Sequence, residues 1–319
     1  MQSVNKKIGI LLATFNGERF LEAQLDSLLS QTHENILIII RDDQSTDGTC
    51  SILRSYEGEY PDKIKVLNVD QVTLGASGNF SVLIAYAINL QIELKLDYFA
   101  FCDQDDIWDS KKLEKQLVSM ISLESESTTK KGLPFLIHCD LEVVNEKAER
   151  ISDSLICYQG LEISKNNFSS LLTSNLVTGC TAMFNPALAR LAVPIPKEAV
   201  MHDWWIAIVA SAFGKIRFVD EALVKYRQHA VNTIGAKRKP SKKRGQFNKV
   251  MEILFLLSNV ETNAHFHSIA EQSKIFRQRY DNELTQRLRI VLRLSSWMKT
   301  NSGPLQHLIY RLLRKINVG

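Results

Sequence analysis

Two apolar runs of the chain end in paired carboxylates, and this pattern restricts the fold more than any other feature. Ile36–Ile40 is a continuous β-branched and leucine run, typical of a strand buried on both faces, and Asp42 and Asp43 follow it. A second apolar run, Tyr98–Cys102, ends in the acidic segment 103–106. Open α/β sheets bind ligands at the carboxyl ends of their strands. The sequence therefore predicts a ligand site where these two strands end.

The N-terminal segment predicts the order of elements in such a sheet. Ile8–Ala13 reads as a buried strand, Thr14–Gly17 as a polar turn, and the following residues carry leucines at helical spacing. The order of elements is a strand, a helix, a strand with an acidic end and a second helix. This order predicts an α/β fold with a mostly parallel central sheet flanked by helices. The turn lacks both Gly-Lys-Ser/Thr and G-x-G-x-x-G, which excludes the phosphate loops of nucleotide hydrolases and dehydrogenases.

The rest of the chain continues this pattern. Further strands are predicted at 64–67, 134–140, 177–184 and 215–219, and an apolar helix is predicted from His202 to Phe213.

The acidic segments allow two interpretations. Asp103 and Asp105 suit a hard divalent cation, since Mg²⁺ takes one or two carboxylates and completes its shell with water and phosphates. The alternative is a solvated turn that caps a helix at Ser110. An EF-hand beginning at Asp43 is excluded, because its twelfth residue is Arg54 instead of glutamate.

Charge divides the chain into two parts. The whole chain has a formal net charge of +4, whereas residues 237–319 contain 17 Lys/Arg and 5 Asp/Glu, or +12, which leaves −8 for residues 1–236. We expect a catalytic domain at 1–236 and a basic, mainly helical extension at 237–319, joined by a linker at 237–244.

The extension contains one helical stripe of apolar residues, with Arg311, Arg314 and Lys315 beside it: Leu305, Leu308, Ile309, Leu312, Leu313 and Ile316. The stripe either packs on the catalytic domain or lies on anionic lipid. Nucleic acid is not an expected partner, because aromatic residues are not interleaved with the basic ones.

The cysteines and the hydropathy indicate a cytoplasmic protein. Five cysteines, an odd number without C-x-x-C spacing, argue against disulfides and zinc sites. No signal peptide is evident and no run of 18 apolar residues exists, so no membrane span is expected.

Four motifs together resemble a known family. Segments 14–17, 42–49, 103–106 and 202–205 are similar in order and spacing to those of family 2 glycosyltransferases of GT-A fold, over about residues 5–235. The segments 103–108 and 226–229 are most similar to the bacterial rhamnosyltransferase branch. The resemblance implies an inverting transfer from a nucleoside diphosphate sugar, assisted by Mg²⁺ or Mn²⁺.

The resemblance also implies roles for single residues. It makes Asp105 the expected direct metal ligand and Asp103 a contact of the donor ribose or, through water, of the metal, and Asp106 can do either. Independently of the resemblance, the imidazole of His229 either completes the metal shell or is structural. The remaining expected donor contacts are Thr14, Asn16, Asp42, Asp43 and Arg227. Arg227 would meet the diphosphate, and Asp42 or Asp43 would accept the imide N–H of uracil or thymine.

Asp203 is the candidate general base. A carboxylate at the start of an apolar helix is either a cap or, with its pKa raised by apolar surroundings, a proton acceptor for the acceptor hydroxyl. Trp204 and Trp205 are expected to form a wall on which the acceptor sugar packs, and Gly179 is expected on the same side.

The expected function is transfer of a sugar, with dTDP-rhamnose the leading donor, to a hydroxyl of a growing, lipid-linked surface polysaccharide at the inner face of the cytoplasmic membrane. A UDP-hexose transferase of the same fold is the alternative. A sugar nucleotidyltransferase lacks support, because no Gly-rich phosphate loop is present. A non-catalytic relative is disfavoured, because Asp105 and Asp203 are both present.

Overall fold

The structure is a computed structural model that describes residues 5–68, 72–127, 132–229, 235–236, 260–300 and 302–318. The predicted linker at 237–244 lies outside the described residues, and the side chains of 260–263 are likewise not described.

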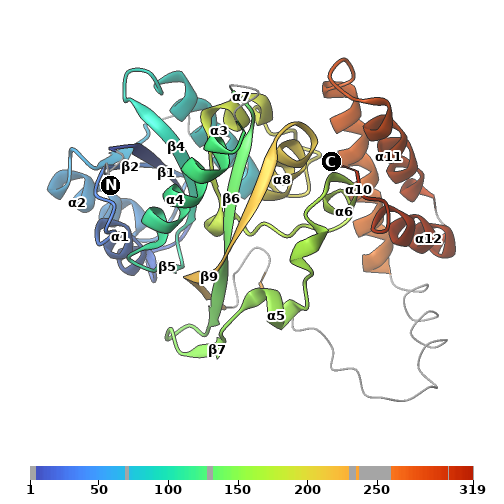
Figure 1. Ribbon diagram of the computed structural model, residues 1–319. Coiled ribbons are helices and arrows are strands. Elements are labelled where there is room, and N and C mark those ends of the chain that lie inside the picture. Colours follow the sequence, from blue (N-terminus) through green and yellow to red (C-terminus); the bar gives the residue numbers. More distant parts are fainter. Residues whose placement is uncertain are drawn as a thin grey trace.

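A mixed β-sheet forms the centre of the described chain (Figure 1). The strand order is β3-β2-β1-β4-β8-β6-β9-β5, and β7 pairs with β6. The first four strands in this order pair in parallel, β8 is antiparallel to both its neighbours, and β6 pairs in parallel with β9. The strands are β1 Lys7–Thr14, β2 Ile36–Asp42, β3 Ile64–Val66, β4 Leu96–Asp103, β5 Ile107–Trp108, β6 Phe135–Val144, β7 Arg150–Ser152, β8 Met183–Phe184 and β9 Lys215–Arg227.

Helices cover both faces of the sheet (Figure 1). They are α1 Leu21–Leu29, α2 Thr49–Glu59, α3 Gly75–Asn89, α4 Lys112–Ser125, α5 Leu155–Gln159, α6 Phe168–Leu171, α7 Pro186–Ala192, α8 His202–Phe213, α10 Val260–Arg279, α11 Gln286–Ser296 and α12 Gly303–Leu313, with 3₁₀ turns η1 Ile163–Lys165, η2 Gly179–Thr181 and η3 Trp297–Lys299. In β1, Ile10 and Leu12 face the core under α1, α2 and α4, whereas Leu11 faces the core under α3, α7 and α8. The parallel strands are buried on both faces, as their continuous apolar sequence predicts.

The predicted strand at 177–184 is mostly wrong. Thr181 N donates to Thr178 O at 2.9 Å and Ala182 N donates to Gly179 O at 2.9 Å, so this segment turns as η2 and only Met183 and Phe184 join the sheet. In the other direction, β9 continues to Arg227, well beyond the predicted end at 219. Its second half pairs with β5 and with β6 after register shifts.

The C-terminal helices share a core with the sheet domain. Trp205 of α8 contacts two rings of the α10 region: its centroid lies 5.5 Å from that of Phe276 and 6.2 Å from that of Tyr280. Ser169 N, at α6, donates to Val318 O at 3.3 Å, which holds the end of the chain against the sheet domain. No helix in the described part of the chain is both long and apolar enough to cross a membrane.

One buried ion pair lies beneath the ligand edge of the sheet. Arg41 and Asp43, both almost fully buried, meet at 2.7 Å. The Asp43 carboxylate also accepts hydrogen bonds from Leu74 N and Gly75 N, both at 2.8 Å. It therefore joins the end of β2 to the start of α3.

We expect Asp43→Ala to lower the free energy of unfolding by about 3–5 kcal/mol, because it leaves the Arg41 charge buried without its partner. Urea unfolding without any donor measures this, with Asp62→Ala at an exposed aspartate as the control. A loss as small as that of the control would contradict the pairing.

Candidate functional site at the carboxyl edge of the sheet

The register of the parallel strands brings the predicted motifs together. Thr14 pairs with Asp42 across β1 and β2, and Ala13 pairs with Asp103 across β1 and β4. Thr14 Oγ1 donates to Asp42 Oδ1 at 2.8 Å. Three segments far apart in the sequence therefore end side by side, as expected of parallel strands.

The turn after β1 is tied to both acidic strand ends. Asn16 has a φ of 49°, a left-handed conformation that asparagine tolerates, and its Oδ1 accepts from Thr46 N at 2.8 Å. Gln104 donates to Phe15 O and accepts from Phe15 N, both at 2.8 Å. A Cβ at Gly17 would overlap Gln104 Oε1, so a larger residue there would displace Gln104. No sequence motif signals the role of Gln104.

The two aspartates after β2 have different surroundings. Asp43 is 3% exposed and its carboxylate is used by Arg41 and by the backbone at the start of α3. Asp42 is half-buried and accepts from Thr14 and Ser45. Asp42 is thus the more accessible of the pair expected to bind the nucleobase.

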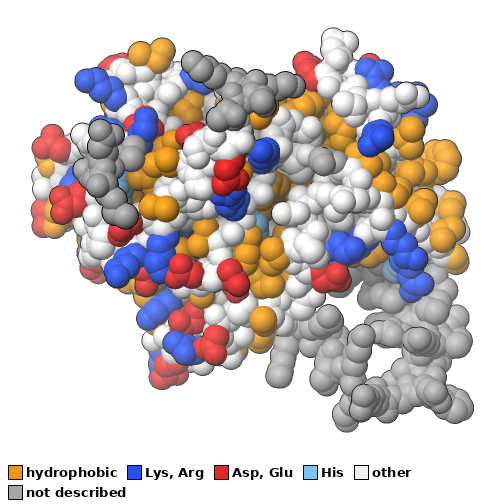
Figure 2. Space-filling view, viewed as in Figure 1, with side chains coloured by type: hydrophobic (Ala, Val, Ile, Leu, Met, Phe, Trp, Pro, Cys, Tyr) orange, Lys and Arg blue, Asp and Glu red, His pale blue; other side chains and the backbone are white. Residues whose placement is uncertain are grey.

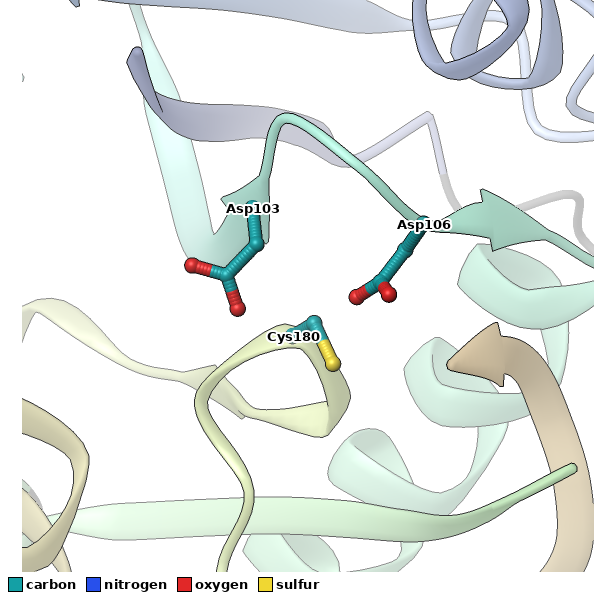
Figure 3. Close-up of side chains that lie close together, drawn as sticks. All are labelled: Asp103, Asp106 and Cys180. Atoms are coloured by element: carbon teal, nitrogen blue, oxygen red, sulfur yellow. The ribbon is translucent and has the colours of Figure 1, made fainter. Parts of the chain in front are cut away.

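Three acidic or thiol side chains converge below the edge (Figure 3). Asp103 ends β4, Asp106 lies in the turn before β5, and Cys180 comes from η2; one ligand atom of each lies within 4.8 Å of the others. Burial, followed by the charges of Asp105 and Asp203, raises the pKa of Asp103 to about 8. Burial also raises the pKa of Asp106 well above its usual value. The cluster therefore favours either protons or a cation.

Asp105 is held beside a histidine. His229 Nε2 lies 2.7 Å from Asp105 Oδ2, and the imidazole contacts Phe20 with ring centroids 5.0 Å apart. Arg227 Nε donates to Asp105 O at 2.9 Å, and Nη1 donates to Glu146 O at 2.6 Å. Arg227 thus fixes the backbone of the acidic turn, a role that its sequence position did not indicate.

A buried lysine lies under the cluster. Lys112, at the start of α4, is fully buried, and its Nζ lies 3.3 Å from the centroid of the Trp108 ring. Burial lowers the pKa of Lys112, and the nearby Cys180 and Asp106 act in the opposite direction. Sequence analysis missed Lys112, because a lysine in an amphipathic helix ordinarily faces solvent.

Asp203 approaches the same site from the other side. Gly179 N donates to its Oδ2 at 2.9 Å, and Asn175 Nδ2 donates to its Oδ1 at 3.2 Å. Burial raises the pKa of Asp203 to about 7, while these hydrogen bonds act in the opposite direction. Gly179, which holds Asp203, is followed in the chain by Cys180, which lies within 4.8 Å of Asp103 and Asp106, so these carboxyl groups belong to one site.

The tryptophans next to Asp203 do not face the site. Trp204 and Trp205 are 5% and 0% exposed, and their indole N–H groups donate to Leu171 O and Ala192 O in the core. Neither ring presents a surface on which a sugar can pack, which corrects the sequence-based expectation. His202 is also buried: its ring stacks on Phe80 at 3.9 Å, and burial lowers its pKa to about 3. Gly179 binds Asp203 through its backbone.

We call Asp103, Asp105 and Asp106, at the end of β4 and in the turn after it, together with Cys180, the acid cluster; its carboxylates fit a divalent cation. Carboxylate oxygens are ligands that suit Mg²⁺ and Mn²⁺. Asp106 Oδ1 accepts from Arg227 N at 3.2 Å, and its buried carboxyl group lies close to Asp103 and to the Cys180 thiol. All five cysteines are free thiols.

Comparison with known proteins places this site in context. Residues 10–126 match the model of the family described as "Glycosyl transferase family 2". An uncharacterized glycosyltransferase of Nostoc sp. is 28% identical over 236 residues, which are 71% of this chain and 66% of that protein. The dTDP-rhamnosyl transferase RfbG of Shigella flexneri is 26% identical over 227 residues, 70% of this chain and 74% of that protein. The chain spans only 39% and 65% of the length of two further curated relatives.

A solved structure confirms the fold. The mannosyltransferase PcManGT from Pyrobaculum calidifontis, in complex with GDP-Man and Mn²⁺, superposes with a TM-score of 0.55 at 12% identity, covering 96% of this chain and 73% of that one. The predicted α/β fold of GT-A type with C-terminal helices is therefore confirmed.

We expect Asp203 to make stability depend on pH. The folded chain holds this proton up to about pH 7, whereas an unfolded aspartate releases it near 3.8, so the stabilisation is fully present below pH 3.8 and is lost as the pH rises through 7. Between about pH 5 and pH 8, the free energy of unfolding of wild type should fall by on the order of 2 kcal/mol more than that of Asp203→Asn.

Urea unfolding in EDTA measures this difference, with Asp62→Asn as the control. The buried histidines are common to all three proteins, so their titration cancels. Identical pH profiles for wild type and Asp203→Asn would contradict the raised pKa.

Proposed function

We propose that this chain is an inverting, metal-dependent glycosyltransferase that moves a sugar from a nucleoside diphosphate sugar to an acceptor hydroxyl. The observation that carries the proposal is that Asp203, held by Gly179 N, lies next to the acid cluster, to which the adjacent residue Cys180 belongs. The match of residues 10–126 to family 2 glycosyl transferases supports it.

In this proposal Asp203 is the general base. A carboxylate with a pKa of about 7 accepts a proton effectively near neutral pH. The backbone of Gly179 and the amide of Asn175 orient it. When the deprotonated hydroxyl attacks the anomeric carbon from the face opposite the diphosphate, a single displacement inverts the configuration.

The acid cluster holds the donor through its diphosphate. A divalent cation bound there supplies positive charge against the negative charge that develops on the leaving diphosphate. Asp103 and Asp105 are its proposed ligands, with His229 completing the shell. Arg227 is proposed to contact the diphosphate. Its hydrogen bonds to the backbone oxygens of Asp105 and Glu146, which hold it next to the cluster, support this role.

The donor is proposed to be dTDP-rhamnose. Asp42, half-buried and beside Thr14, is the proposed acceptor of the thymine imide N–H, with Asn16 in the adjoining turn. Asp43 would act indirectly, through the start of α3. The similarity to a protein named as a dTDP-rhamnosyl transferase supports this donor. The proposed acceptor is a lipid-linked surface polysaccharide at the inner face of the cytoplasmic membrane.

We expect Asp203→Asn to bind donor as wild type does but to transfer sugar about 10²–10⁴ times more slowly, because only the proton acceptor is lost. Calorimetry of donor binding and a product assay measure the two quantities, and NMR of the wild-type product should show the inverted anomeric configuration. A variant that loses donor affinity yet keeps its turnover at saturation would assign Asp203 to binding.

We expect dTDP-rhamnose to raise the melting temperature of wild type only when Mn²⁺ or Mg²⁺ is present, and more than UDP-glucose or GDP-mannose does. Asp105→Asn should abolish the metal-dependent increase in melting temperature, because the cluster loses one anionic ligand. Asp109→Asn, at an exposed acid just after β5, is the matched control. Equal protection in EDTA would overturn the metal role, and a larger effect of UDP-glucose would favour a UDP-hexose donor.

A further inference from the structure

We infer that the outer face of α12, with the neighbouring end of α11, is a docking surface for an anionic lipid bilayer. The sequence left two alternatives for the apolar stripe of this helix, core or lipid. The structure divides it: Ile309 and Leu313 are buried, whereas Leu305, Leu308 and Leu312 are 41%, 63% and 44% exposed. We call these three exposed leucines the outer stripe. The inference does not depend on the proposed reaction.

The outer stripe is continuous along one side of the helix. At 100° per residue the three leucines fall within about 60° of one another, and Arg311 and Lys315 adjoin them on the side away from the core. Side chains of the buried edge, Ile309 and Leu313, occupy the other side. The helix is therefore anchored along one edge and leaves an apolar face with a basic border.

The segment that carries the outer stripe is basic, and it also exposes an aromatic residue and an isoleucine. Residues 286–318 contain seven Lys/Arg and no Asp/Glu. Trp297, between α11 and α12, is 61% exposed, and Ile290 of α11 is 50% exposed. In Figure 2 hydrophobic and basic side chains gather at the right of the view, over α11 and α12 of Figure 1.

Charge decides which occupant fits this surface. The described ion pairs of the segment involve Arg289, Lys299 and Arg314, and none includes Arg311 or Lys315. A second copy of the chain would bring an equal excess of positive charge against this face, which opposes a symmetric dimer. An anionic bilayer fits this surface, because its negative headgroups attract the basic border and its apolar layer accepts leucine and tryptophan side chains.

Vesicle sedimentation of the full-length protein tests the inference, without donor or acceptor. We expect binding to vesicles of phosphatidylglycerol and phosphatidylcholine at low salt, weakened by high salt, and little binding to phosphatidylcholine alone. Leu308→Ser with Leu312→Ser should lower the partition constant at least about tenfold. Arg311→Gln with Lys315→Gln should lower it about fivefold per charge, or roughly 25-fold for the pair.

Matched controls come from elsewhere on the surface. Ile92→Ser with Val118→Ser removes two more exposed apolar side chains, and Lys111→Gln with Lys197→Gln removes two exposed charges. Both controls should bind vesicles as wild type does, and circular dichroism should show all four variants folded.

The inference is overturned if wild type stays in the supernatant with anionic vesicles at low salt, or if the α12 variants bind no more weakly than the controls. It is also overturned if wild type is a dimer by light scattering that Leu308→Ser with Leu312→Ser converts to a monomer. In that case a second copy covers the outer stripe.

Discussion

Burial of neighbouring carboxyl groups is the constraint on which the site depends. Asp103, Asp106 and Asp203 approach from three segments, and burial raises the pKa of each. The fold tolerates this because backbone hydrogen-bond donors are fixed around the cluster: Gly179 N on Asp203 and Arg227 N on Asp106. Positive charge at this edge of the sheet would therefore stabilise the ionised form of the cluster. A metal-bound diphosphate, as proposed for the donor, would supply that charge, because the metal replaces protons that the cluster otherwise holds.

The parallel register of β1, β2 and β4 determines which residues surround this site. Pairing of Thr14 with Asp42, and of Ala13 with Asp103, aligns three strand ends on one edge. The turn after β1 then connects them, since Gln104 binds both backbone groups of Phe15. On the far side, η2 replaces what would have been a longer strand, and that turn is what frees Gly179 N to hold Asp203. The shortened strand is therefore part of how the candidate base is positioned.

Sequence predicted the parallel half of the sheet well, because doubly buried strands such as β1 and β2 are continuous apolar runs whose ends are marked by polar residues. It failed where burial is decided by tertiary neighbours. The sequence predicts that Trp204 and Trp205 form a surface for a sugar, but α8 is covered by helices whose position no local pattern reveals. The second half of β9 carries exposed Lys225 and pairs through register shifts, so neither alternation nor an apolar run marks it. Gln104 and Lys112 act through contacts that are distant in sequence, and their residue types give no signal of that.

The C-terminal helices are connected to the site through α8. The first turn of this helix presents Asp203, and the next residues, Trp204 and Trp205, pack into the core that α10 completes with Phe276 and Tyr280. The helix that carries the candidate base is thus held from behind by the same C-terminal segment whose outer stripe faces solvent. Loss of that segment would expose Trp205 and loosen the first turn of α8, so the placement of Asp203 depends on residues more than 70 positions away. For this reason the basic extension is better regarded as a structural part of the candidate enzyme than as a detachable tail, and a contact between its outer face and a bilayer would fix the orientation of the whole site relative to that surface.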